Sequence, residues 1–124
     1  MKFCSTETCH LFFATLANPT RLAILEVLGD GPHNVAEISE ALKQEQSMVS
    51  HNLKPLEECA FVFSERRGRE RIYRLNKQII EPLFDLFVYH ESKYCPSGRV
   101  CLTAKGIVRE KKKEAAKELY VNHE

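Results

Sequence analysis

The sequence predicts a mainly α-helical domain with one small β-hairpin, on three observations. The first half of the chain contains successive apolar-periodic segments, each bounded by a capping or turn residue such as Asn18 or Asn34. Two later segments, 60–66 and 69–75, alternate apolar and polar residues around a connection that contains Gly68. With 124 residues and 44% hydrophobic content, the chain can bury one compact core. A single domain with helices and a hairpin is therefore expected.

Four helices are expected before the hairpin. Ser5 or Thr6 caps the first, and Asn18 caps the second, where Pro19 occupies the first helical position without losing a needed N–H. Asn34 caps the third, and Pro55 is expected to bend the C-terminal half of the fourth. The expected spans are 5–17, 19–29, 35–42 and 44–56.

The fourth segment has two chemically different faces. Its apolar residues recur at helical spacing and are Met48, Val49, Leu53 and Leu56. The remaining face carries short donors and acceptors with one cation, namely Gln46, Ser47, Ser50, His51 and Lys54. Such a face suits base edges and phosphates, although a solvated surface helix is the alternative interpretation. Because a short helix precedes it, the pair predicts a helix-turn-helix whose second helix reads the major groove.

Positive charge is concentrated in the hairpin, although the net charge of the whole chain is only +1. The segment 65–77 carries Arg66, Arg67, Arg69, Arg71, Arg74 and Lys77 against only Glu65 and Glu70. We expect Arg66, Arg67 and Arg69, at the tip, to hold phosphates or to reach the minor groove. Arginines can also simply protect a sheet edge. Their position directly after a helix-turn-helix favours DNA binding.

A fifth helix is expected between residues 77 and 94, and it has more apolar surface than one monomer core needs. The surplus predicts a homodimer. Pro82 indicates that this helix begins near Glu81. We therefore expect residues 1–94 to form a DNA-binding and dimerisation domain, followed by a cysteine-containing loop and a charged helix or tail over residues 95–124.

Three stretches resemble the ArsR/SmtB family of small winged-helix repressors. They are Leu16-Ala17-Asn18-Pro19-Thr20-Arg21-Leu22, then Ser47-Met48-Val49-Ser50-His51-Asn52-Leu53-Lys54, and Gly68-Arg69 with Tyr73-Arg74-Leu75. The resemblance extends from about Leu16 to Phe87. It implies a winged helix-turn-helix of five to six helices with a two-stranded wing. It also implies a homodimer, paired through its first and last helices, that binds an inverted-repeat operator in double-stranded DNA and leaves it when a metal, metalloid or oxidant occupies a cysteine or histidine site.

Two recurrent metal sites of that family are missing from this sequence. Asn34 and Ala36 stand where a Cys-x-Cys pair binds metal on the third helix. On the last helix, neither Asp85 nor His90 is followed by the residues of the family's Asp-x-His and His-x-x-Glu or His-x-x-His pairs. Any effector site must therefore use other residues.

The five cysteines, Cys4, Cys9, Cys59, Cys95 and Cys101, are the remaining candidates. In a cytoplasmic chain they favour metal-binding, redox-active or buried thiols over a disulfide framework. Cys95 and Cys101 resemble the cysteine placement of arsenite-responsive members, and Cys4 or Cys9 is expected to complete the site. Thiolates suit As(III), Sb(III) or another soft metal ion. A Cys95–Cys101 disulfide switch and a structural zinc stay open as alternatives, whereas Cys59 is expected to be an ordinary core or surface residue.

Other function classes find little support in the sequence. We expect no signal peptide and no membrane span, and therefore a cytoplasmic protein. No Ser/His/Asp arrangement, acid pair or glycine-rich phosphate loop indicates an enzyme or a required cofactor. A winged-helix module that binds an acidic protein partner instead of DNA is the alternative, and a thiol-using enzyme is a more distant one.

Overall fold

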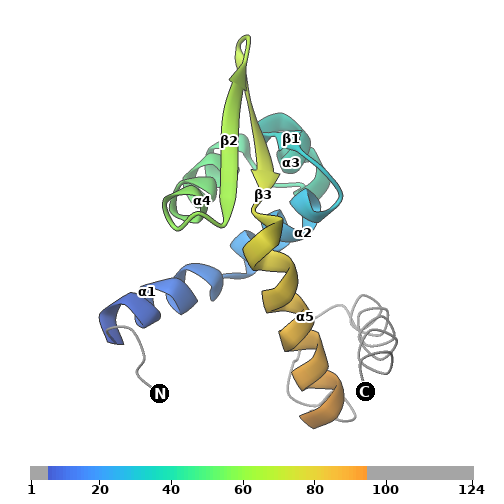
Figure 1. Cartoon of the computed structure of the whole chain (residues 1–124). Coiled ribbons are helices and arrows are strands. Elements are labelled where there is room, and N and C mark those ends of the chain that lie inside the picture. Colours follow the sequence, from blue (N-terminus) through green and yellow to red (C-terminus); the bar gives the residue numbers. More distant parts are fainter. Residues whose placement is uncertain (1–5, 95–124) are drawn as a thin grey trace. The chain divides into compact units, whose positions relative to one another are not determined.

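The structure is a computed structural model that describes residues 6–94 (Figure 1). These residues form five helices and three strands, in the order α1 (Thr6–Leu16), α2 (Pro19–Gly29), β1 (His33–Asn34), α3 (Val35–Leu42), α4 (Gln46–Glu58), β2 (Val62–Arg67), β3 (Glu70–Leu75) and α5 (Lys77–Tyr94). The chain divides into two compact units, Met1–Lys77 and Gln78–Glu124. Helices α3 and α4 are the expected helix-turn-helix, and β2 and β3 are the expected wing.

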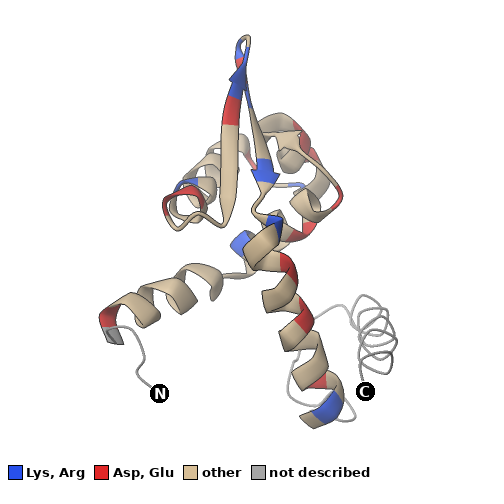
Figure 2. Cartoon of the chain, in the orientation of Figure 1, with Lys and Arg blue, Asp and Glu red and all other residues tan. Residues whose placement is uncertain are grey.

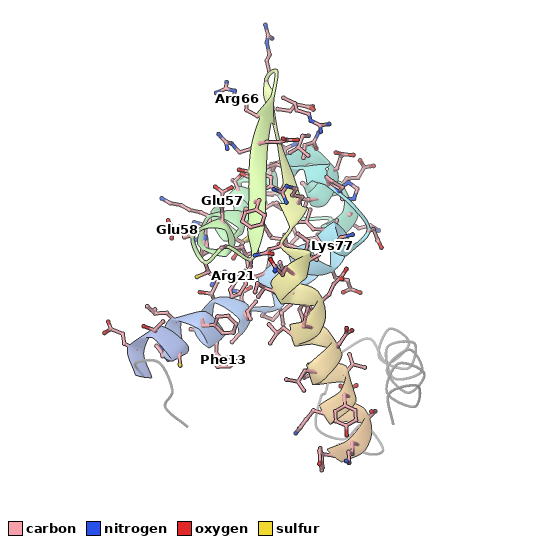
Figure 3. All side chains as sticks on the ribbon, viewed as in Figure 1. Phe13, Arg21, Glu57, Glu58, Arg66 and Lys77 are labelled. Carbon is pink, nitrogen blue, oxygen red and sulfur yellow. The ribbon has the colours of Figure 1, made fainter. Side chains whose placement is uncertain are left out.

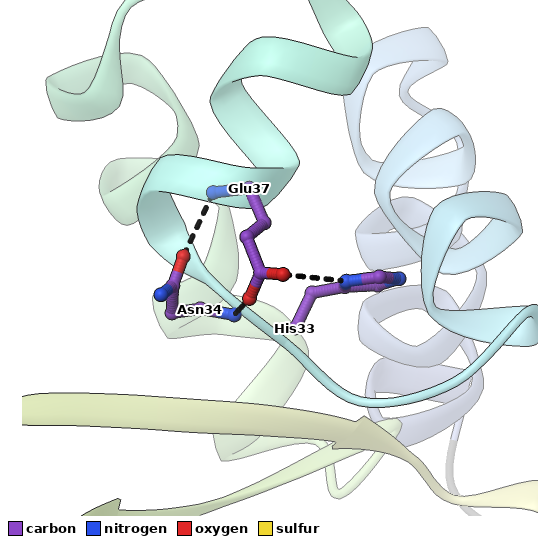
Figure 4. Close-up of polar contacts among 3 residues, drawn as sticks. All are labelled: His33, Asn34 and Glu37. Carbon is purple, nitrogen blue, oxygen red and sulfur yellow. Dashed lines mark hydrogen bonds and ion pairs between the residues drawn. The ribbon is translucent and has the colours of Figure 1, made fainter.

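The starts of α2 and α3 follow from their caps. The Asn18 side chain accepts a hydrogen bond from the Arg21 N–H at 3.1 Å, and Pro19 opens α2. Asn34 and Glu37 form a reciprocal capping box at the start of α3, in which each side chain accepts the other's backbone N–H, at 2.8 and 3.0 Å (Figure 4). The predicted caps at Asn18 and Asn34 are confirmed.

The sheet has one strand more than the sequence predicts. β2 and β3 pair in antiparallel register through the two-residue turn Gly68–Arg69, and β1 pairs with the other edge of β3, with His33 opposite Tyr73. Gly68 has a φ of +64°, which suits the first position of a type II′ hairpin turn. The expected two-stranded wing is thus part of a three-stranded sheet. The sequence does not predict β1, because two residues are too few to show an alternating pattern of apolar and polar side chains.

The core of the first unit is formed by apolar side chains from α2, α3, α4, the strands and the connection that precedes β2. Those buried are Ile24, Leu25, Leu28, Ile38, Val49, Leu53, Leu56, Phe61, Val62 and Leu75. Removing each such side chain from water contributes roughly 1.5–3 kcal/mol before the entropy of ordering it is subtracted. Helix α1 joins the core through Leu16, which is buried, and through Phe12, whose ring meets that of Phe61 edge-on with 5.1 Å between the ring centroids. Phe13, labelled in Figure 3, is mostly exposed.

Helix α4 is shifted towards the C-terminus relative to its predicted span of 44–56, and the strand after it starts at Val62 rather than Ala60. The intervening residues close the helix. The Phe61 N–H donates to Leu56 O at 2.9 Å and the Ala60 N–H to Glu57 O at 3.0 Å, while Ala60 takes a φ of +58°. This is a Schellman motif with alanine where glycine is usual. Without that glycine, the sequence does not show where the helix ends.

Helix α5 begins at Lys77, not near Glu81 as Pro82 suggests. Pro82 is the sixth residue of the helix, so it removes only one early i to i−4 hydrogen bond. The exposed apolar residues of α5 are Ile79, Leu86, Phe87 and Tyr94. No single helix among residues 6–94 is long and apolar enough to cross a membrane; Glu7–Leu16 and Pro19–Gly29 reach that length and composition only as a pair bent by 71°.

Candidate nucleic-acid interface

Helix α4 presents a continuous polar surface to solvent. Its five predicted DNA-contact residues are all exposed, and we call them the reading face: Gln46, Ser47, Ser50, His51 and Lys54. Val49, Leu53 and Leu56 hold the opposite side of the helix in the core. Met48, which the helical spacing groups with the apolar residues of this segment, is 50% exposed. Its place on the buried side is taken by Asn52, which is only 5% exposed.

Asn52 belongs to a small polar network that sequence reasoning missed. Its Oδ1 accepts a hydrogen bond from Arg21 Nε at 3.2 Å, and its Nδ2 donates to Met48 O at 2.9 Å. Arg21, labelled in Figure 3, also donates from Nη1 to Thr15 O at 3.3 Å. The sequence does contain one indication of this network. Asn52 is three residues after Val49 and four before Leu56, so helical spacing places its amide on the buried side of α4.

The three wing arginines differ in their surroundings. Figure 2 shows basic residues at the hairpin tip, and Arg66, Arg67 and Arg69 are all exposed. Arg67 forms an ion pair with Glu65, with Nη2 to Oε1 at 3.0 Å and Nε to Oε1 at 3.1 Å. Arg66 donates to Gly68 O at 3.3 Å. Arg69 has no hydrogen bond or ion pair with any described residue, so of the three wing arginines it is the one most available to a phosphate.

The base of the wing is joined to the last turn of α4. The Ser64 hydroxyl donates to Glu57 Oε2, and Arg71 Nη1 donates to the same hydroxyl oxygen at 2.9 Å. Burial raises the pKa of Tyr73, and the charge of Glu57 raises that pKa further. The exposed Glu57–Ser64–Arg71 chain connects the end of α4 to the wing, but exposed polar contacts of this kind hold the two elements together only weakly.

Two of the five cysteines, Cys9 and Cys59, lie within the residues that the structure describes. Cys4, Cys95 and Cys101 lie outside the described residues. Cys9 is half-buried on α1 and its sulfur is disulfide-bonded here, so it can ligate a metal ion only after reduction. Cys59 is a free, exposed cysteine, with Sγ 3.4 Å from Thr15 Oγ1. Within residues 6–94, no three His, Cys, Asp or Glu side chains are grouped so that they can hold a metal ion.

Comparison with known proteins identifies the family. Residues 18–64 match the model described as "Bacterial regulatory protein, arsR family". The chain also resembles a possible transcriptional regulatory protein of Mycobacterium bovis, fragment 1–100, with 30% identity and a TM-score of 0.60 over 65% of this chain and 87% of that one. This chain belongs to the ArsR family. The solution structure of the M. bovis fragment is described as a homodimeric winged helix-turn-helix DNA-binding domain; it is 29% identical, with a TM-score of 0.57 over 70% of this chain and 86% of that one.

Two curated relatives of this ArsR-family chain are named as regulators. The HTH-type transcriptional regulator NmtR of Mycobacterium tuberculosis is 41% identical over 60% of this chain and 62% of its own length. The arsenical resistance operon repressor of Staphylococcus xylosus is 29% identical over 53% of this chain and 64% of its own length. The chain spans less than two thirds of the length of the first curated relatives it matches. Neither the family nor the fold is that of an enzyme.

Proposed function

We propose that this protein is a cytoplasmic transcriptional repressor that binds double-stranded operator DNA as a homodimer. The observation that carries the proposal is the exposed reading face of α4, which is held by a buried opposite side and is followed in the same unit by a basic wing. In this proposal the reading face enters the major groove, while Arg66, Arg67 and Arg69 contact phosphates or the minor groove. Residues 1–94 carry DNA binding and dimerisation.

The geometry of a symmetric dimer sets the expected operator. Two reading helices related by a two-fold axis match an inverted repeat whose half-sites lie roughly one helical turn apart, ~34 Å or slightly more. Support for a dimer comes from the exposed apolar residues of α5 and from the homodimeric M. bovis relative. Sedimentation of the protein at micromolar concentration tests this part directly, and a monomer there would contradict it.

DNA binding is tested with a random-sequence duplex at several salt concentrations. We expect binding at low salt that is lost steeply as salt rises, because a protein that contacts phosphates displaces condensed counterions. A winged-helix module for an acidic protein partner is the second candidate, since exposed arginines suit both ligands. Absence of binding to any duplex in dilute buffer would favour that module and reject the repressor.

The effector that we propose is a soft metal or metalloid ion, most simply As(III) or Sb(III), bound by Cys95 and Cys101 with Cys4 or Cys9. Thiolates prefer such ions, and one relative is named for arsenical resistance. No resident cofactor is required. Binding releases the operator if the ion has a higher affinity for the dimer geometry that fits DNA poorly. A thiol-redox switch by a Cys95–Cys101 disulfide is the alternative, because accessible thiolates are also the groups that oxidants attack.

One mobility-shift experiment separates these effectors. The wild-type protein and a Cys95→Ser, Cys101→Ser variant are bound to DNA and treated in turn with arsenite, cadmium and a thiol oxidant. Release of the wild type by arsenite but not by the oxidant supports the metalloid, and the reverse supports the redox switch. Equal release of the double variant and the wild type would reject a C-terminal thiol site.

A further inference from the structure

Arg21 occupies a junction between three helices. It lies in the first turn of α2, and its guanidinium donates from Nε to the Asn52 side chain on α4 and from Nη1 to the backbone oxygen of Thr15 in the last turn of α1. Thr15 and Asn52 are 8% and 5% exposed, so both contacts lie at the margin of the core. The backbone N–H of Arg21 is held as well, by Asn18.

The contact to Asn52 constrains α4 in a way that its apolar neighbours do not. Val49, Leu53 and Leu56 hold the helix by burial, which depends on area and has little directional preference. A hydrogen bond weakens steeply when its angle or length departs from the optimum. Asn52 directly follows His51 in the sequence, and successive residues point about 100° apart around a helix. The direction of Asn52 therefore fixes the directions of Ser50 and His51 on the reading face.

We propose that Arg21 is a positioning residue of α4, and that its contacts to Asn52 and Thr15 set the rotation of the reading face and hence the sequence preference for DNA. The inference rests on the proposed DNA-binding function. A residue that only stabilised the fold would affect binding to all DNA sequences alike. Loss of the Arg21 geometry impairs the match to bases, whereas phosphate contacts, which are made by exposed flexible cations, are retained.

The test compares Arg21→Lys with the wild type on two probes. The specific probe is a duplex that the wild-type protein selects from a randomised pool, and the non-specific probe is poly(dI-dC). Lysine keeps the charge but loses the planar fork that reaches Asn52 and Thr15 together. We expect affinity for the selected duplex to fall about tenfold, the scale of one lost base contact. Affinity for poly(dI-dC) and the slope of binding against salt are expected to stay unchanged.

Arg74→Lys is the matched control, because Arg74 is exposed and lies over the Phe63 ring at 4.7 Å without contacting α4 through a hydrogen bond. It is expected to keep the ratio of specific to non-specific affinity. Asn52→Ala removes the acceptor of the same hydrogen bond and is expected to lower the ratio of specific to non-specific affinity by a similar factor. If the two residues act together, Arg21→Lys and Asn52→Ala combined reduce specific binding little more than either alone.

The outcomes separate the inference from the function on which it rests. If the wild type binds neither probe, the proposed function fails. If the wild type binds both and Arg21→Lys keeps the wild-type ratio, Arg21 is not a positioning residue. A parallel fall on both probes that follows a lower melting temperature means that Arg21 only stabilises the fold. If Arg21→Lys does not fold, Asn52→Ala is judged by the same ratio.

Discussion

Arg21 Nε donates a hydrogen bond to Asn52 Oδ1 at 3.2 Å, and this contact joins the start of α2 to the buried side of α4. The amide of Asn52 is nearly inaccessible to water, yet its oxygen is paired with Arg21 and its nitrogen with Met48 O. Burying an amide is unfavourable unless it is hydrogen-bonded. The pairing therefore allows a polar, directional contact at a place where the other contacts of α4 are apolar.

Asn52→Ala is expected to lower the free energy of unfolding by about 1–3 kcal/mol, because it leaves the Arg21 Nε–H without its partner. Urea unfolding followed by circular dichroism measures the change. Ser50→Ala is the control, since Ser50 is exposed on the same helix, and its expected effect is within about 0.5 kcal/mol. Equal stability of the two variants would show that the Arg21–Asn52 contact contributes nothing.

Arg69→Ala is expected to flatten the salt dependence of DNA binding more than Arg67→Ala does. Each phosphate contact contributes about −0.9 to the slope of log affinity against log salt. Arg69 is unpaired among the described residues, whereas Arg67 has to leave Glu65 before it can neutralise a phosphate. Fluorescence anisotropy on a random duplex at several salt concentrations gives both slopes. A larger effect at Arg67 would reverse the assignment.

Glu65→Gln is expected to strengthen binding to all DNA sequences alike. The substitution removes a carboxylate from the wing and frees Arg67 without changing the reading face. The gain is expected to shrink as salt rises, because exposed charges are screened within about 8–10 Å at 0.1–0.15 M salt. The same anisotropy titrations measure it. A gain confined to one sequence would instead indicate that Glu65 contributes to base selection.

Caps and turn chemistry made much of this fold predictable. Asn18, Pro19, Asn34 and Gly68 act as their sequence context suggests, because each satisfies a local backbone requirement. The start of β2 was misplaced because Ala60 adopts a left-handed conformation that a sequence normally signals with glycine. β1 was missed because it exists only through pairing with β3, which is distant in the sequence.

The sequence predicted which side chains of the candidate site are exposed to solvent, but not which hydrogen-bond and ion-pair partners they have. All five residues of the reading face are exposed, as the helical pattern indicated. Arg67 is paired with Glu65, whereas Arg69 has no partner among the described residues. This difference arises from the folded hairpin and cannot be read from the sequence. Asn52, and not Met48, lies on the buried side of α4. Its amide is paired there with Arg21, which is 31 positions away in the sequence.

Ala60→Gly is expected to stabilise the protein by up to about 1 kcal/mol. A left-handed conformation costs a residue with a Cβ about 1–2 kcal/mol, and the greater freedom of glycine in the unfolded chain offsets part of that gain. The hydrogen bonds of the Schellman motif use only backbone atoms and are retained. Urea unfolding measures the change. Ala36→Gly, at an exposed position within α3, is the control and is expected to destabilise by a similar amount.

The capping box of α3 predicts a dependence of stability on pH (Figure 4). The N–H of Asn34 lowers the pKa of the Glu37 carboxyl from its usual 4.5, and His33, 3.5 Å away at Nδ1, lowers that pKa further. A carboxyl with a lowered pKa in the folded state stabilises that state above its unfolded pKa. This contribution disappears as pH falls through the folded value.

Glu37→Gln keeps an acceptor for the Asn34 N–H but carries no charge, so the pH-dependent part of the stability should be lost. Wild type is expected to exceed the variant in urea midpoint at pH 6, and the difference should vanish as pH falls well below 4.5. Glu40→Gln is the control, because its carboxylate has no hydrogen-bond or ion-pair partner among the described residues. A difference at Glu37 that persists unchanged at pH 3 would mean that the amide fits the cap poorly, and that the carboxylate charge is not responsible.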